Sequence, residues 1–255
     1  MITVTEAQIS AWLSPLLWPF FRVLAMFTAA PVFSNRAFPM RSKVGLALLV
    51  AVCAQASLGG QPQVSFNGPL ALETLVQQVV IGLAIGFSVR VVFASMELAG
   101  ELIGLQMGLN FATFFNPTSN AQSSSTAIFF GNMTTLLFIV MNGHLLVLMA
   151  VIRSFEVFPV GSSLMGALAK VRLYGLGVDL FSSALWIAMP MIAVLLLVNL
   201  TLGIISRVAP QMNIYAIGFP VTLSVGLLGI SITLPMLDQP FATLFTRTIE
   251  LFSAH

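Results

Sequence analysis

Residues 71–108 read ALETLVQQVVIGLAIGFSVRVVFASMELAGELIGLQMG, and this stretch decides the class of fold. A helix needs about 20 apolar residues to cross a bilayer. Charge interrupts the stretch at only a few positions, namely Glu73, Arg90, Glu97 and Glu101. We therefore expect a membrane-grade helix over 71–94 that runs on toward residue 108.

The composition of the whole chain agrees with a membrane protein. Of its 255 residues, 58% are hydrophobic and 7% are charged, and the mean hydropathy is +1.01. Soluble proteins carry about 25% charged residues, so this chain has too few charges to cover a soluble surface. Composition therefore predicts an all-α integral membrane protein. The net charge of +2, without a basic run, argues against nucleic acid as a partner.

Charged, proline and glycine residues divide the rest of the chain into further apolar segments. We expect helices over 8–31, 44–59, 126–152, 180–206 and 214–237, followed by an amphipathic helix over 240–252. The last two long helices are joined by RVAPQMN, in which Arg207, Pro210 and Gln211 form a tight turn. Two helices with so short a connection form an antiparallel hairpin.

The basic residues do not follow the positive-inside rule. They come after the expected helices that end near residues 31, 152, 206 and 237. Because successive loops of a serpentine bundle face opposite sides of the membrane, these loops cannot all be cytoplasmic. Either some helices do not cross the membrane, or charge does not set the topology.

Charged side chains share one face of the helix expected over 90–108. At 100° per residue, Arg90, Glu97 and Glu101 fall within about 40° of one another. The two carboxylates form an i, i+4 pair of like charge, which is mildly unfavourable. Arg90 is two turns away, so a cation from another element would be needed to relieve the pair.

Glycines extend this face toward the end of the helix. Gly100, Gly104 and Gly108 have the GxxxGxxxG spacing that lets another backbone approach closely, and Gly82 and Gly86 repeat the device. We interpret the combined face as a packing surface. Its partner is either another part of this chain or another subunit, and the sequence favours neither.

The stretch GLQMGLNFATFFNPTSNAQSSST, residues 104–126, is uncharged but too polar and too broken for an ordinary span. Irregular backbone at membrane depth occurs only where it is buried in protein or lines a water-filled path. An external loop and an uncharged pore constriction are both open readings. The aromatic cluster and the helix-breaking pair are Phe111, Phe114, Phe115, Asn116 and Pro117.

No pattern in the chain predicts catalysis or a cofactor. Nucleophile-elbow, zinc-protease, phosphate-loop and dinucleotide-binding motifs are missing. His144, in MNGHLLVL (141–148), suits a hydrogen-bonded core or interface position. We therefore expect no cofactor and no enzyme. The alternative is a stand-alone polytopic small-solute transporter, which would need paired charges near a helix break, and residues 104–126 have none.

Four stretches of the chain resemble the FliR family of flagellar export-gate proteins, which has counterparts in virulence type III secretion. The likeness covers nearly the whole chain, and the Arg-x-x-Pro-Gln-Met-Asn turn is long and unusual. The stretches are FFRVLAMFTAAPVFSNRAFPMRSKVGLAL (20–48), GLQMGLNFATFFNPTSNAQSS (104–124), MNGHLLVL (141–148) and RVAPQMNIYAIGFPVTLSVG (207–226).

This resemblance implies a bacterial inner-membrane protein at the flagellar basal body, assembled with FliP and FliQ into the export gate. Residues 1–175 would be FliP-like, and residues 176–255 would be a FliQ-like hairpin with a C-terminal segment. FlhB is expected to wrap the gate and FlhA to pass unfolded flagellar proteins to it. In such assemblies many apolar helices stand above the bilayer and need not span it.

The resemblance also implies a role for the central segment. In the family, the segment matching about 106–122 is a plug inside the channel. Carried onto this chain, the plug residues are Met107, Gly108, Leu109, Asn110, Phe111, Phe114, Phe115, Asn116 and Pro117.

Overall fold

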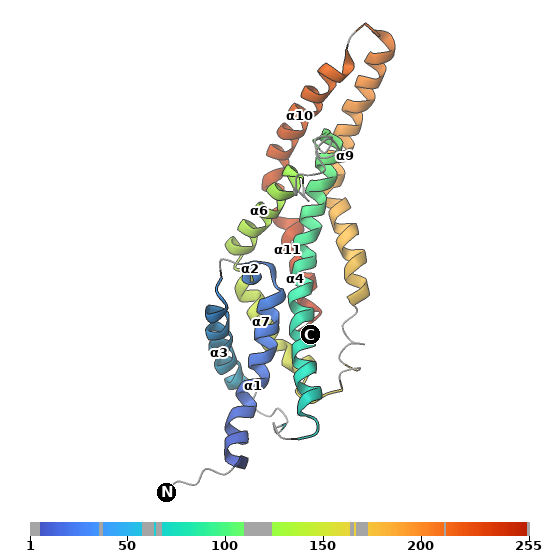
Figure 1. The fold of residues 1–255 in the computed structure, drawn as a ribbon. Helices are drawn as coiled ribbons and strands as arrows, with labels where there is room; N and C mark the ends of the chain where they lie inside the picture. Colours follow the sequence, from blue (N-terminus) through green and yellow to red (C-terminus); the bar gives the residue numbers. More distant parts are fainter. Residues whose placement is uncertain are drawn as a thin grey trace, which may run out of the picture. The chain divides into compact units, whose positions relative to one another are not determined.

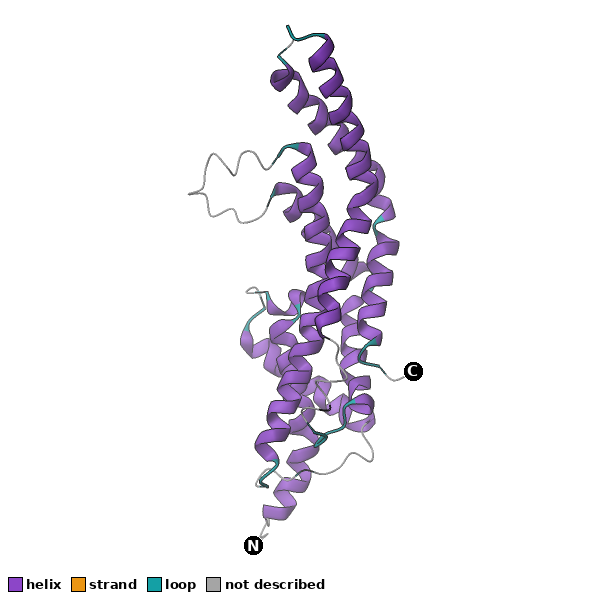
Figure 2. Cartoon of the chain, turned by 90° about the vertical axis from the view of Figure 1, so that its right-hand side faces the viewer, coloured by secondary structure: helices purple, strands orange, loops and turns teal. Residues whose placement is uncertain are grey.

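A computed structural model describes residues 6–35, 38–57, 64, 68–109, 124–163, 166, 173–211 and 213–253. Within these ranges the chain folds into helices joined by short turns, without a strand (Figures 1 and 2). This confirms the predicted all-α class. The helices are α1 (Glu6–Ala29), α2 (Pro31–Ser34), α3 (Met40–Ser57), α4 (Ala71–Met107), α6 (Ser125–Val140), α7 (Gly143–Val157), α9 (Leu173–Val208), α10 (Ile214–Thr233), the 3-10 helix η1 (Leu234–Met236) and α11 (Asp238–Glu250).

Helix α4 is continuous over the stretch that decides the fold class, as predicted. The single helix predicted over 126–152 is wrong, because the chain breaks between α6 and α7 with a bend of 69°. Asn142 sits at the break with a φ of 55°, a left-handed conformation that asparagine tolerates better than most residues. Its carbonyl then accepts from Leu145 and Leu146, which starts α7.

Three helices in the described part are long and apolar enough to cross a membrane: Ala71–Met107, Gly175–Val208 and Ala216–Met236. The bent pair α6 and α7 adds a fourth if it counts as one span. Helix α1 contains a further apolar stretch, Leu13–Ala29, among the residues whose side chains the structure describes.

The contacts divide the chain into two compact units. The first contains Met1–Val91, Ile139–Leu176 and Phe245–His255, and the second contains Val92–Phe138 and Gly177–Leu244. These units interleave along the sequence, so they differ from the predicted FliP-like and FliQ-like parts. That division concerns likeness to other subunits and stays a prediction.

The first unit is built around α1, which packs against α3 and α4. Trp18 on α1, Phe155 on α7 and Val160 form a small buried cluster. Close contact between α1 and α4 depends on Gly82 and Gly86. A Cβ on Gly82 would overlap the backbone carbonyl of Arg22, and one on Gly86 would lie 2.8 Å from the Met26 carbonyl.

Arg22 is fully buried inside this first unit. Its Nε donates to Gln78 Oε1 at 2.8 Å, and its two terminal nitrogens donate to Ser154 Oγ at 2.9 Å and to the Phe158 carbonyl at 2.8 Å. The guanidinium carbon lies 3.6 Å from the centre of the Phe155 ring, a cation–π distance. A buried cation is thus held by neutral oxygens from α4, α7 and the end of α7.

The network continues from Gln78 to the turn that follows α7. Gln78 Nε2 donates to Gln77 Oε1, which also accepts from the Gly161 amide. Gln77 Nε2 donates to the Pro159 carbonyl and to Ser162 Oγ, at 3.1 and 2.6 Å. Since buried polar groups are costly when unpaired, this chain of bonds specifies how α1, α4 and α7 pack.

The second unit contains the C-terminal part of α4, α6, and the hairpin of α9 and α10, which Figure 1 draws in orange and red. Phe93 on α4 meets Phe138 on α6 and Phe241 on α11 edge to face, with ring centres 5.5 and 6.4 Å apart. Met191 on α9 fills the space beside Gly229 on α10. Most residues in the apolar stretch of each hairpin helix are not buried within the chain.

Candidate functional site

The C-terminal end of α4 is the point where the chain enters the predicted plug. Gly108 has a φ of 80°, and its amide donates to the Leu105 carbonyl at 3.1 Å. The Leu109 amide donates to the Gly104 carbonyl, also at 3.1 Å. These two bonds with a left-handed glycine are a Schellman cap, so Gly108 ends the helix by its backbone conformation.

Met107, the last residue of α4, is fully buried against α10. A Cβ added to Gly226 would lie 2.5, 2.6 and 2.7 Å from its Cγ, Cε and Sδ atoms. Thr222, one turn earlier on α10, donates its hydroxyl to the Met107 carbonyl at 3.3 Å. Helix α10 therefore contacts both the side chain and the last carbonyl of α4.

The other end of the segment, at the start of α6, is fixed to the same part of α4. The Glu101 carboxylate accepts from the Ser124 amide at 3.2 Å and from the Ser124 hydroxyl at 2.7 Å. The Ser124 hydroxyl also accepts from the Ala127 amide, which caps α6. Thr126 occupies the space where Gly104 would carry a Cβ.

Of the predicted plug residues, Met107, Gly108 and Leu109 are described, and Leu109 is half-buried. The other predicted plug residues lie outside the described part of the chain: Asn110, Phe111, Phe114, Phe115, Asn116 and Pro117. What the structure does establish is that the described residues on both sides of 110–123 are held at the last two turns of α4.

The glycine stripe of α4 meets helices of this same chain. A Cβ on Gly100 would lie 2.8 Å from the Thr126 carbonyl and 2.9 Å from the Phe130 ring. Gly104 faces Thr126, while Gly82 and Gly86 face α1. Of the two partners that the sequence left open for these four glycines, the structure shows another part of this same chain.

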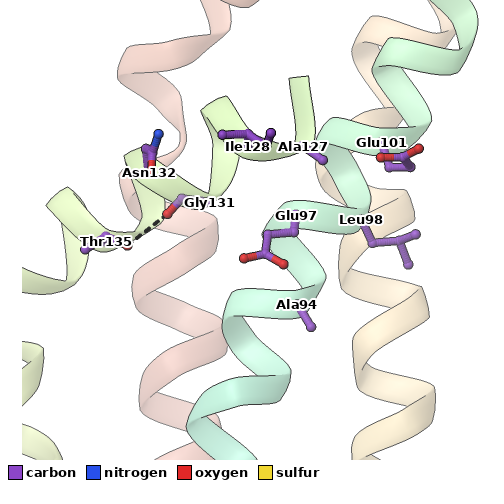
Figure 3. A pocket seen from close by; sticks show the side chains of 9 residues that line it. All are labelled: Ala94, Glu97, Leu98, Glu101, Ala127, Ile128, Gly131, Asn132 and Thr135. Carbon is purple, nitrogen blue, oxygen red and sulfur yellow. Dashed lines mark hydrogen bonds between the residues drawn. The ribbon is translucent and has the colours of Figure 1, made fainter. Parts of the chain in front are cut away.

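The two carboxylates of the stripe line a pocket of about 530 Å³ between α4 and α6 (Figure 3). Asn132 and Thr135 of α6 line it as well. Glu97 is exposed, and its carboxylate lies near Gly131, where a Cβ would be 3.0 Å from Oε1. Arg90 is also exposed, on α4 within the first unit.

The hairpin turn places Arg207, Pro210 and Gln211 at exposed positions. The Ala209 amide donates to the Ile205 carbonyl and closes α9, and the Asn213 side chain accepts from the Ala216 amide and caps α10. An uncharged pocket of about 740 Å³ lies between this hairpin and the end of α4, and Gly108, Asn199 and Thr222 line it.

The described residues offer little for chemistry. Across the described ranges, no three His, Cys, Asp or Glu side chains gather as metal ligands would. His144 is half-buried on α7.

Sequence reasoning missed several residues that carry these contacts, namely Arg22, Thr222 and Gly226. Thr222 and Gly226 lie within RVAPQMNIYAIGFPVTLSVG, and their i, i+4 spacing puts them on one face of α10. Nothing local in the sequence connects them to Met107, since Thr222 is 115 residues away along the chain.

Comparison with known proteins gives consistent matches. The family described as "Bacterial export proteins, family 1" matches residues 13–248. The chain is 38% identical over 255 residues to the flagellar biosynthetic protein FliR of Escherichia coli K12, covering 99% of this chain and 97% of that protein. It is 39% identical over 256 residues to FliR of Pectobacterium carotovorum, with the same coverage. FliR of Bacillus subtilis is 26% identical over 234 residues, covering 91% of this chain and 90% of that protein.

Proposed function

Because the chain belongs to the bacterial export protein family that contains the flagellar FliR proteins, we propose that it completes and seals the channel of the flagellar export gate. Family membership assigns it to flagellar protein export. The finer proposal concerns how it acts there. Unfolded flagellar proteins pass through the gate, and the uncharged segment near 106–122 blocks ions while no substrate is present.

The observation that supports sealing is the anchorage of both ends of the segment. Met107 and Gly108 fix its start to α10 and to the cap of α4, and Ser124 fixes its end to Glu101. A seal needs fixed points of attachment, and the described residues on both sides of 110–123 supply them. Its phenylalanines carry no charge, and uncharged apolar constrictions exclude water and ions.

The proposed partners are FliP and FliQ, with FlhB and FlhA on the substrate side, at the inner membrane of the flagellar basal body. The exposure of the hairpin helices supports an assembly. In an apolar stretch of 18 residues within each helix, only 17% of the residues in Gly175–Val208 and 22% of those in Ala216–Met236 are buried within the chain. Apolar helices this open are covered by lipid or by other subunits. The work of the chain is steric, without catalysis or a cofactor.

Co-expression tests the proposed assembly. The full chain expressed with its FliP and FliQ homologues should co-purify as one complex, whereas the chain alone should aggregate or be degraded. A stable, monodisperse monomer purified without partners would contradict the proposal. Removing the chain from a flagellated cell should abolish export of flagellar subunits, and restoring it should recover export.

A further inference from the structure

Met107 contacts α10 through both its side chain and its backbone carbonyl. Gly226 presents a slot that the Met107 side chain fills, because three of its atoms lie within 2.7 Å of the position a Cβ would take. Any residue other than glycine at 226 would displace the methionine. Met107 is fully buried there.

A tether accompanies the slot on the same face of α10. The Thr222 hydroxyl, one helical turn from Gly226, lies 3.3 Å from the Met107 carbonyl and 3.1 Å from the Phe219 carbonyl of its own helix, so the two carbonyls share its one hydrogen. The last carbonyls of a helix have no partner within the helix, and Thr222 offers a donor to one of them. Backbone and side chain of one residue are thus held by two positions of α10.

A second methionine extends the arrangement by one helical turn. Met191 of α9 fills the space beside Gly229 of α10, three residues beyond Gly226. Toward the hairpin turn the packing becomes open: Gly203 has no atom within 4 Å of its Cβ position, and Gly218 has only Leu202 Cδ1, at 3.6 Å. The helices are therefore packed tightly at Met107 and loosely nearer the hairpin turn.

We propose that Met107 is a positioning residue, and that its seat on Gly226 and its tether to Thr222 set where the sealing segment begins. This inference rests on the proposed sealing function. Methionine suits the task because its flexible thioether can leave and re-enter a slot without breaking a polar pair. Gly226 leaves the space that the Met107 side chain fills, and Thr222 contacts the Met107 backbone carbonyl.

The test uses gates assembled from the full chain with its FliP and FliQ homologues. In Gly226→Ala the new methyl group should displace Met107, and the Gly108 and Leu109 amides should exchange with deuterium about tenfold faster. The matched control is Gly218→Ala on the same helix, where a Cβ meets only an ordinary contact, and exchange there should not change. Met107→Ala on its own empties the slot, and it should speed the exchange of the same two amides, because it removes the side chain that the slot holds.

Ion conductance separates a positioning role from a merely structural one. Gly226→Ala and Met107→Ala gates should leak ions, and Gly218→Ala gates should not. Thr222→Val should leak, while Thr222→Ser, which keeps the hydroxyl, should not; this pair serves if Gly226→Ala fails to assemble. The inference would be overturned if the Gly108 and Leu109 amides exchanged equally fast in Gly226→Ala and Gly218→Ala. It would also be overturned if neither Gly226→Ala nor Thr222→Val gates leaked ions.

A deletion of residues 110–120 distinguishes the two levels of the proposal. If the deletion leaks but Gly226→Ala and Thr222→Val do not, sealing stands and the positioning role of Met107 is wrong. If the deletion itself does not leak, the sealing function fails, and the positioning role built on it falls with it.

Discussion

Glu101 accepts two hydrogen bonds from Ser124, one from its backbone amide at 3.2 Å and one from its hydroxyl at 2.7 Å. A carboxylate on α4 therefore holds the residue that caps α6. The bonds join positions that are 23 residues apart, one on each side of the predicted plug in the sequence. This relationship ties the charge stripe of α4 to the segment that we propose seals the gate.

Ser124→Ala should weaken this contact. The substitution removes the hydroxyl that donates to Glu101 and caps the Ala127 amide. Loss of such a cap costs about 1 kcal/mol. Thermal unfolding of the purified complex should show a lower Tm, while Ser124→Thr, which keeps a hydroxyl, should remain near the parent. Identical melting of Ser124→Ala and the parent would argue against the contact.

Gly104→Ala should be poorly tolerated. Its Cβ would enter space that Thr126 occupies, and overpacking of this kind costs about 1–3 kcal/mol. Gly203→Ala on α9 is the matched control, since a Cβ there meets open space. Assembly yield of the complex should fall for the first variant and not for the second. Equal yields would mean that α4 and α6 do not pack as described.

Ser154→Ala should destabilise the first unit. It removes an acceptor from the fully buried Arg22 guanidinium, and hydrogen bonds to charged groups contribute about 1.5–3 kcal/mol. Ser154→Thr keeps the hydroxyl and is the control. Chemical unfolding of the purified complex, followed by tryptophan fluorescence, measures the difference. A Ser154→Ala protein as stable as the parent would show that Arg22 does not depend on this contact.

Glu97→Lys should disrupt the assembled gate. We propose that the pocket lined by Glu97 and Glu101 receives a basic side chain of a neighbouring subunit, since opposite charges favour contact. Glu97→Gln, which keeps the shape, should lower co-purification with the FliP and FliQ homologues much less than the charge reversal. If Glu97→Lys and Glu97→Gln co-purify equally well, no cation of a partner occupies the pocket.

Local chemistry was enough to predict the all-α class and the continuous helix α4. Apolar length and sparse charge determine both, and they need no knowledge of distant contacts. The glycine spacing indicated close packing along α4 but could not name the partner helix. The break at Asn142 was missed although Asn142–Gly143 is a turn-forming pair, because the apolar run on both sides reads as one helix.

The buried polar contacts lay beyond prediction for a different reason. Arg22 meets partners 56, 132 and 136 residues away, so no window of sequence contains the network. Thr222 likewise reaches Met107 only through the fold. Residues 110–123, which carry most of the predicted plug, lie outside the described part of the chain, so their role stays a proposal.

Ion conductance of assembled gates in planar bilayers tests the sealing claim most directly. Gates with residues 110–120 deleted should conduct ions in the absence of substrate, and parent gates should not. Phe114→Asp should also leak, whereas Phe114→Leu should stay tight, because an apolar constriction excludes ions and a charged one admits them. Unchanged, low conductance in the deletion and in Phe114→Asp would contradict the account.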